Sequence, residues 1–122
     1  MIPTQLELTC EISADGKAVV TLSGELDIAS SGSAFRCVRD VIDRHHVPVI
    51  VDLADLTFCD AHGLGTLVRM SNYAGKGGCP LQLASPAPHL LKIMRITGLD
   101  RSLAIRAQQS DRGRPETEAS SA

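Results

Sequence analysis

Apolar residues in the first quarter of the chain follow a period of two. In residues 6–12, leucine, cysteine and isoleucine alternate with polar residues, which is typical of a half-buried β-strand. The Asp15-Gly16 pair favours a tight turn, and residues 18–23 form a second apolar run. The pattern therefore predicts a hairpin. A later apolar run, residues 47–53, predicts a third strand that is buried.

Apolar residues at spacings of three and four predict two helices in the middle of the chain. The first helix follows the serine-rich segment 30–33. Its apolar face is formed by Ala34, Val38, Val41 and Ile42. The second helix spans about residues 61–74, with Gly75 as its expected C-cap.

A third helix and two short strands are expected in the last third of the chain. Residues 81–84 and 103–106 are short apolar runs that predict strands. Between them, Ser85 is the expected N-cap and Pro86 the first helical residue, because proline lacks only an amide that would be unpaired there. The helix ends at Gly98. Its predicted inward face consists of Leu90, Ile93, Met94 and Thr97.

The predicted order is ββαβαβα(β), a single α/β domain in which a small mixed sheet carries helices packed mainly on one face. The domain is expected to span residues 1–107. Residues 108–122 have no apolar face and are expected to form a disordered tail. The sheet face without helices is expected to meet solvent or a partner.

Composition narrows the classes of function. The chain of 122 residues has a formal net charge of −2 and an aromatic content of 2%, so neither a basic surface nor stacking residues indicate direct nucleic-acid binding. No apolar run approaches the roughly 20 residues of a membrane span. The first five residues lack the pattern of a signal peptide. A cytoplasmic protein that binds no membrane is expected.

The cysteines and histidines predict neither a metal site nor a cofactor site. Cys10, Cys37, Cys59 and Cys79 contain no C-x-x-C pair and are expected to be reduced. The Asp60 carboxylate beside Cys59 is expected to raise the pKa of that thiol, which argues against a nucleophile. His45, His46 and His89 lack ligand spacing.

The most informative segment is residues 56–65, between the third strand and the second helix. Asp60 is the predicted N-cap of that helix, with Ala61 and His62 at its first positions. A helix start at the carboxyl end of a strand is where open α/β sheets present a recognition surface. For His62, a phosphoaccepting or pH-sensitive role stands against a solvent-facing residue at an interface rim, and the latter is favoured.

Four segments resemble the STAS domain of the bacterial anti-sigma factor antagonists. They are Gly24-Glu25-Leu26-Asp27, Val51-Asp52-Leu53 with Phe58-Cys59-Asp60, Gly63-Leu64-Gly65, and Ser85-Pro86 with Ile96-Thr97-Gly98-Leu99-Asp100. These segments fall in the family's order and spacing, and the resemblance covers about residues 6–106. It implies a small mixed sheet with helices packed against it, in agreement with the hydrophobic pattern.

The resemblance also implies a site and a partner. In the partner-switching branch of the family, the site reads Asp-Ser-Ser/Thr-Gly-Leu. Its first serine is phosphorylated by an anti-sigma factor, a serine kinase with a histidine-kinase-like ATPase fold. The unphosphorylated antagonist binds this partner and frees a sigma factor. The matching residues here, expected together with Asp27 to bind the partner, are Asp60, Ala61, His62, Gly63 and Leu64.

Ala61 stands at the acceptor position and has no hydroxyl group. In the family, phosphate there abolishes binding by adding nearly two negative charges, so this switch is expected to be absent. The protein is then either a constitutively competent antagonist or a domain with another binding role. Hydroxyls elsewhere remain candidates for phosphate, although cap and turn roles are favoured for them: Ser30, Ser31, Ser33, Thr57 and Thr66.

An enzyme is not expected. The sequence contains no nucleophile elbow, no P-loop and no dinucleotide-binding glycine pattern. The leading prediction is therefore a non-catalytic regulatory binding module without a cofactor. The alternative is a STAS domain used as a sensor of a small molecule or nucleotide, or as a scaffold interaction module. The sequence predicts neither the identity of the sigma factor nor the oligomeric state.

Overall fold

The computed structural model describes residues 6–106. Its first two strands, β1 (Leu6–Ile12) and β2 (Ala18–Leu26), form the predicted antiparallel hairpin. Gly16 in the connecting turn has a φ of +86°, a backbone conformation that glycine adopts without steric cost. The Ser13 N–H closes the turn by donating to the Lys17 carbonyl oxygen at 2.7 Å.

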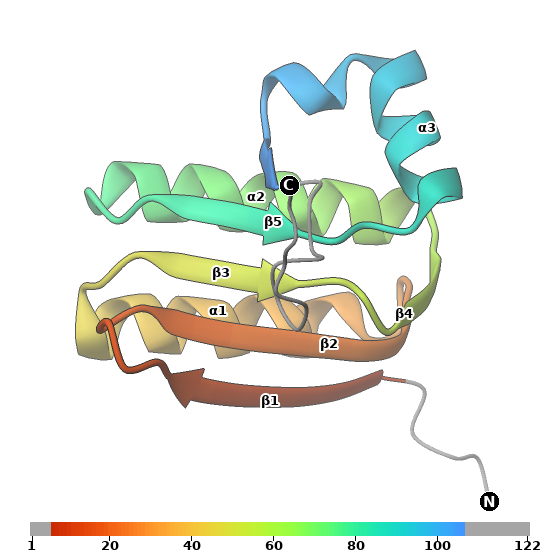
Figure 1. The fold of residues 1–122 in the computed structure, drawn as a ribbon. Helices are drawn as coiled ribbons and strands as arrows, with labels where there is room; N and C mark the ends of the chain where they lie inside the picture. The colour runs from red at the N-terminus through yellow and green to blue at the C-terminus, as the bar shows by residue number, and fades with distance from the viewer. Residues whose placement is uncertain (1–5, 107–122) are drawn as a thin grey trace, which may run out of the picture.

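The remaining strands run parallel to β2. They are β3 (Val49–Asp52), β4 (Leu56–Cys59), β5 (Leu81–Ala84) and β6 (Ala104–Arg106). The sheet order is β1-β2-β3-β5-β6, while β4 pairs separately with the end of β2. A register shift between Gly24 and Glu25 accompanies this second pairing. Since parallel strands end at the same edge of a sheet, the carboxyl ends of β2, β4 and β5 lie at one edge (Figure 1).

The helical elements are α1 (Ser31–His45), α2 (Ala61–Lys76), α3 (Pro88–Thr97) and the short 3-10 helix η1 (Leu99–Arg101). Figure 1 shows α1 and α2 side by side on one face of the sheet, with α3 beyond the end of β5. The core lies between that sheet face and the two helices. Its largest fully buried side chains include Leu22, Leu26, Ile42, Leu53, Leu67, Met70, Leu83, Leu90 and Met94. This arrangement confirms the predicted fold class and element order. The strand β4 was not predicted and is an addition to that order.

The predicted start of α3 was wrong. The helix begins at Pro88, with Ala87 as its N-cap and no capping side chain. Proline disfavours helical backbone at the residue before it, and Ala87 accordingly has an extended ψ of 152°. Ser85 lies outside the helix with a φ of +58°. Its Oγ is buried and has no hydrogen-bond partner among the described residues.

Two further helical details differ from the prediction. Gly75 lies inside α2, which continues to Lys76 and has Gly77 as its C-cap. On α3, Leu90 and Met94 are buried as predicted, but Ile93 and Thr97 are exposed. Because α3 stands beyond the end of the sheet (Figure 1), it buries a narrower stripe than a helix that lies flat on the sheet.

The predicted disordered tail, residues 108–122, lies outside the described residues. Among residues 6–106, no helix combines the length and the apolar character needed to cross a bilayer.

Candidate functional site

Asp60 connects β4 to α2 and caps the helix, as predicted. Its backbone is extended, and its Oδ1 accepts a hydrogen bond from the Gly63 N–H at 2.8 Å. This bond satisfies one of the amides that a helix start leaves unpaired. The second carboxylate oxygen, Oδ2, accepts from the Ile28 N–H at 3.3 Å. One side chain therefore joins the start of α2 to the loop between β2 and α1.

Asp27 organises that loop from within. Its Oδ1 accepts from the N–H groups of Ala29 and Ser30, both at 3.0 Å. Its backbone carbonyl accepts from the Ser31 hydroxyl at 2.6 Å. Asp27 is half-buried, so its carboxylate has a clear structural role in folding the loop that carries Ile28.

Gly63 allows α2 to approach the end of β2 closely. A Cβ atom at this position would lie 2.4 Å from the Leu26 carbonyl oxygen and 2.8 Å from the Cys59 Sγ. Both distances are far shorter than van der Waals contact, and the closer one involves backbone that cannot turn aside. The same Leu26 oxygen accepts from the Asp60 N–H at 3.2 Å. The glycine of the Asp-x-x-Gly segment is therefore required by packing.

Ala61 and His62 are exposed at the first positions of α2, while Leu64 is half-buried and packs against the core. Beside them, Ile28 is 66% exposed, and its N–H reaches the Asp60 cap. We refer to Ile28, Ala61 and His62 as the loop–helix surface. The six predicted site residues thus meet at one edge of the sheet, where Asp27, Asp60 and Gly63 shape the backbone.

Ile28 was not among the residues predicted for the site. The available signal was an apolar residue directly after Asp27, outside the apolar faces of both neighbouring elements. Its exposure depends on how Asp27 and Asp60 fold the loop, which a hydrophobic pattern does not report.

The hydroxyl groups near the helix start differ in accessibility. Ser31 and Thr66 are buried, and the Thr66 hydroxyl donates to the His62 carbonyl oxygen at 2.9 Å. Ser30 is half-buried, and its hydroxyl donates to the Glu25 carbonyl oxygen at 2.9 Å. Thr57 and Ser33 are exposed, although the Thr57 hydroxyl donates to the Gly24 carbonyl oxygen at 3.0 Å.

Cys59 lies close to the site but is unsuited to nucleophilic chemistry. Burial, with a smaller effect from the Asp60 carboxylate, raises the pKa of the Cys59 thiol to about 12. The thiol therefore stays protonated near neutral pH, whereas the thiolate is the reactive form. Within residues 6–106, no cluster of three or more histidine, cysteine or acidic side chains is arranged to hold a metal ion.

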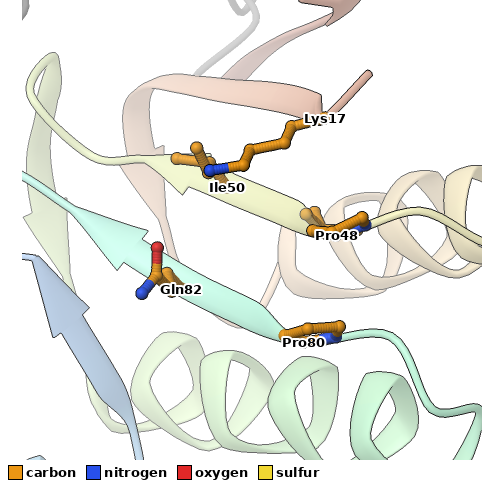
Figure 2. Close-up of a pocket in the computed structure, with 6 residues that line it drawn as sticks. Lys17, Pro48, Ile50, Pro80 and Gln82 are labelled. Carbon is orange, nitrogen blue, oxygen red and sulfur yellow. The ribbon is translucent and has the colours of Figure 1, made fainter. Parts of the chain in front are cut away.

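A hollow of about 240 Å³ opens at the opposite end of the parallel strands (Figure 2). It is lined by Lys17, Pro48, Val49, Ile50, Pro80 and Gln82. Figure 2 shows the Lys17 side chain reaching toward Ile50. This hollow lies at the amino ends of β3 and β5, and so is separated by the length of the sheet from the loop–helix surface.

The fold and this edge define an α/β domain with an exposed helix start at the carboxyl end of a mixed sheet. The family model described as "Mlab, STAS domain" matches residues 10–106. The chain therefore belongs to the STAS-domain family.

Known proteins and structures resemble the chain along most of its length. A STAS-domain containing protein of Pseudomonas aeruginosa is 27% identical over 104 residues, which cover 82% of this chain and 99% of that protein. An anti-sigma factor antagonist from Mycobacterium paratuberculosis has a similar fold, with a TM-score of 0.73 and 23% identity, over 87% of this chain and 89% of that one. The unphosphorylated anti-sigma factor antagonist SpoIIAA matches with a TM-score of 0.66 and 18% identity, over 87% and 93% of the chains.

Proposed function

We propose that the protein is a non-catalytic regulatory module that binds an anti-sigma factor through the loop–helix surface and thereby frees a sigma factor. Membership of the STAS family and the likeness to anti-sigma factor antagonists support a regulatory role. The partner that fits the resemblance best is an anti-sigma factor of the serine-kinase type with a histidine-kinase-like ATPase fold. Both proteins would act in the cytoplasm.

The observation that carries the proposal is the environment of Ala61. This residue is exposed at the first position of α2, directly after the Asp60 cap, where the partner-switching proteins carry their acceptor serine. Ala61 adds no charge to the loop–helix surface, and the neighbouring Ile28 is an apolar side chain at 66% exposure. Removing such apolar area from water favours association, so this surface suits close docking.

Ala61 also distinguishes this module from an antagonist that is switched off by phosphorylation. SpoIIAA occurs in an unphosphorylated and a phosphorylated form. Ala61 has no oxygen that could accept a phosphoryl group. The module would therefore remain competent to bind in the presence of its kinase partner and ATP, because no charge can be added at this position.

Paired affinity captures from lysate of the native cell test the proposed function. Wild-type protein should recover an anti-sigma factor, and Ala61→Asp should recover at least about tenfold less, because docking would bury an unpaired carboxylate. The carboxylate of an aspartate in the first turn of a helix interacts favourably with the positive end of the helix dipole. The Ala61→Asp variant should therefore stay folded.

The matched control is Gln82→Glu, which adds the same charge at an exposed position in β5, at the other end of the sheet. It should recover the partner as well as wild type does. If wild-type protein recovers no anti-sigma factor, the proposed function is wrong. If all three baits recover it equally, the partner binds elsewhere on the molecule.

Ligand sensing is a second candidate function, and the hollow at the amino ends of β3 and β5 favours it. The hollow combines apolar side chains with the Gln82 amide, and Lys17 supplies a cation at its rim. Thermal unfolding with and without nucleotides tests this candidate, since a ligand that binds only the folded state raises the melting temperature. Stabilisation that is lost in Lys17→Ala would favour sensing over partner binding.

A further inference from the structure

Two of the four free cysteines, Cys10 in β1 and Cys37 in α1, lie on elements that both pack against β2. Cys10 stands in the edge strand β1, opposite Val20 of β2. Residues directly opposite each other in an antiparallel pair project from the same face of the sheet, and Val20 is fully buried on the helix-covered face. The Cys10 side chain therefore projects from that face as well, at its exposed edge.

Cys37 lies on the side of α1 that is turned toward β1. Phe35 lies on the side of α1 that faces α2, because the centroid of its ring is 5.9 Å from the centroid of the Tyr73 ring of α2. Two residues along a helix correspond to a rotation of about 200°, so Cys37 is turned away from α2. Since α1 packs on β2 and α2 packs on β5, the side of α1 away from α2 is the side of β1.

The ionisation of the two thiols agrees with this placement. Partial burial raises the pKa of the Cys37 thiol, and the next largest cause is Cys10, ahead of Asp40 on the same helix. Asp40 is three residues from Cys37, which places the two side chains on neighbouring turns of the helix. The Cys10 thiol therefore lies near enough to act electrostatically on the Cys37 thiol, although the two residues are distant in the sequence.

We propose that Cys10 and Cys37 form a reversible intramolecular disulfide that ties β1 to α1 under mild oxidation by a peroxide. Partial burial and the Glu11 carboxylate raise the pKa of the Cys10 thiol, so the first step uses its minor thiolate form. This thiolate attacks one peroxide oxygen, the O–O bond breaks, and Cys10 becomes a sulfenic acid while hydroxide leaves and is protonated to water. The Cys37 thiolate then attacks the Cys10 sulfur, forms the S–S bond and displaces hydroxide, which takes up a proton to give the second water. In sum, two thiols and one hydrogen peroxide give one disulfide and two waters.

The remaining cysteines should not compete for oxidant. Cys79 is buried and Cys59 is half-buried, whereas the Cys10 thiol is exposed to the solvent that carries the oxidant. The pair is also remote from the loop–helix surface, because Cys10 lies in the edge strand and Cys37 in the middle of α1. This proposal therefore stands independently of the proposed function.

Oxidation of the native, reduced protein with one equivalent of hydrogen peroxide tests the pair. The intact mass should fall by two hydrogen atoms, and peptide mapping should link Cys10 to Cys37. The melting temperature should rise by about 10 °C, because the cross-link restricts the unfolded chain, and dithiothreitol should reverse the shift. Cys59→Ser is the matched control and should oxidise as wild type does.

Cys37→Ser separates the two chemical steps. Without its partner thiol, Cys10 should accumulate as a sulfenic acid that dimedone traps, whereas the wild type should give little adduct. The proposal is overturned if the wild type accumulates sulfenic acid without losing two hydrogens. A link to Cys59 or Cys79, or a covalent dimer through Cys10 as the main product, would also overturn it.

Discussion

At the scale of single residues, one carbonyl group decides what can occupy position 63. The Leu26 oxygen at the end of β2 accepts the Asp60 N–H and lies 2.4 Å from the place that a Cβ of residue 63 would occupy. Any side chain there would push the start of α2 away from the sheet and weaken the capping bond beside it. The glycine therefore fixes the position of the loop–helix surface.

Gly63→Ala should lower the free energy of unfolding by about 2–3 kcal/mol, because the new methyl group clashes with backbone that cannot move freely. Urea denaturation measures this loss. Gly65→Ala is a close control, since a Cβ at position 65 would meet nothing within 4 Å. Alanine favours a helix over glycine by up to about 1 kcal/mol, so this control should be neutral or stabilising. Equal effects of the two substitutions would contradict the packing argument.

At the scale of elements, the Asp60 carboxylate connects the β2–α1 loop to α2. Its two oxygens accept from amides that belong to different elements, Ile28 in the loop and Gly63 in the helix. The exposed position of Ile28 therefore depends on a cap that lies 32 residues further along the chain. Removing the carboxylate should affect both amides together.

Asp60→Ala should destabilise the fold by about 1 kcal/mol, the usual cost of losing an N-cap side chain. In hydrogen exchange, the amides of Ile28 and Gly63 should both lose protection. Asp60→Asn keeps one side-chain acceptor and should leave the Gly63 amide better protected than Asp60→Ala does. Loss of protection at Gly63 alone would show that the loop holds its shape without Asp60.

The spacing of apolar residues was sufficient to predict the main helices and strands, but not the short strand β4 or the start of α3. The hairpin, α1 and α2 have long apolar faces, and the structure confirms them. β4 has only four residues and pairs with β2 after a register shift, so no alternating pattern marks it. The start of α3 was misplaced because Ser85-Pro86 has the composition of a helix start, whereas Pro88 keeps the preceding residue extended.

The candidate site was predictable where its contacts are local in the sequence, and not where they join distant segments. The cap at Asp60 is local, since an N-cap bonds to amides two or three residues away, and the structure confirms it. The exposure of Ile28 and the close approach at Gly63 arise from contacts between segments that are distant in the sequence. The role of the six residues in binding a partner remains a prediction.

At the scale of the whole molecule, the fold separates three features. The loop–helix surface lies at the carboxyl edge of the sheet, and the hollow beside Lys17 lies at the amino edge. Cys10 lies in the edge strand β1 and Cys37 in α1. Because a rigid sheet keeps these regions apart, substitutions in one should leave the others intact, which makes partner binding, ligand binding and oxidation separately measurable.

Calorimetric titration of the recovered anti-sigma factor tests whether the loop–helix surface binds a partner without a phosphate switch. Wild-type protein and Ala61→Ser are each incubated with that partner and ATP, repurified and titrated again. Wild-type affinity should be unchanged and its mass should gain no phosphate. Ala61→Ser should gain one phosphate and lose at least about tenfold in affinity. A wild-type protein that gains phosphate, at Thr57, Ser33 or His62, and then fails to bind would show that a phosphate switch is still present.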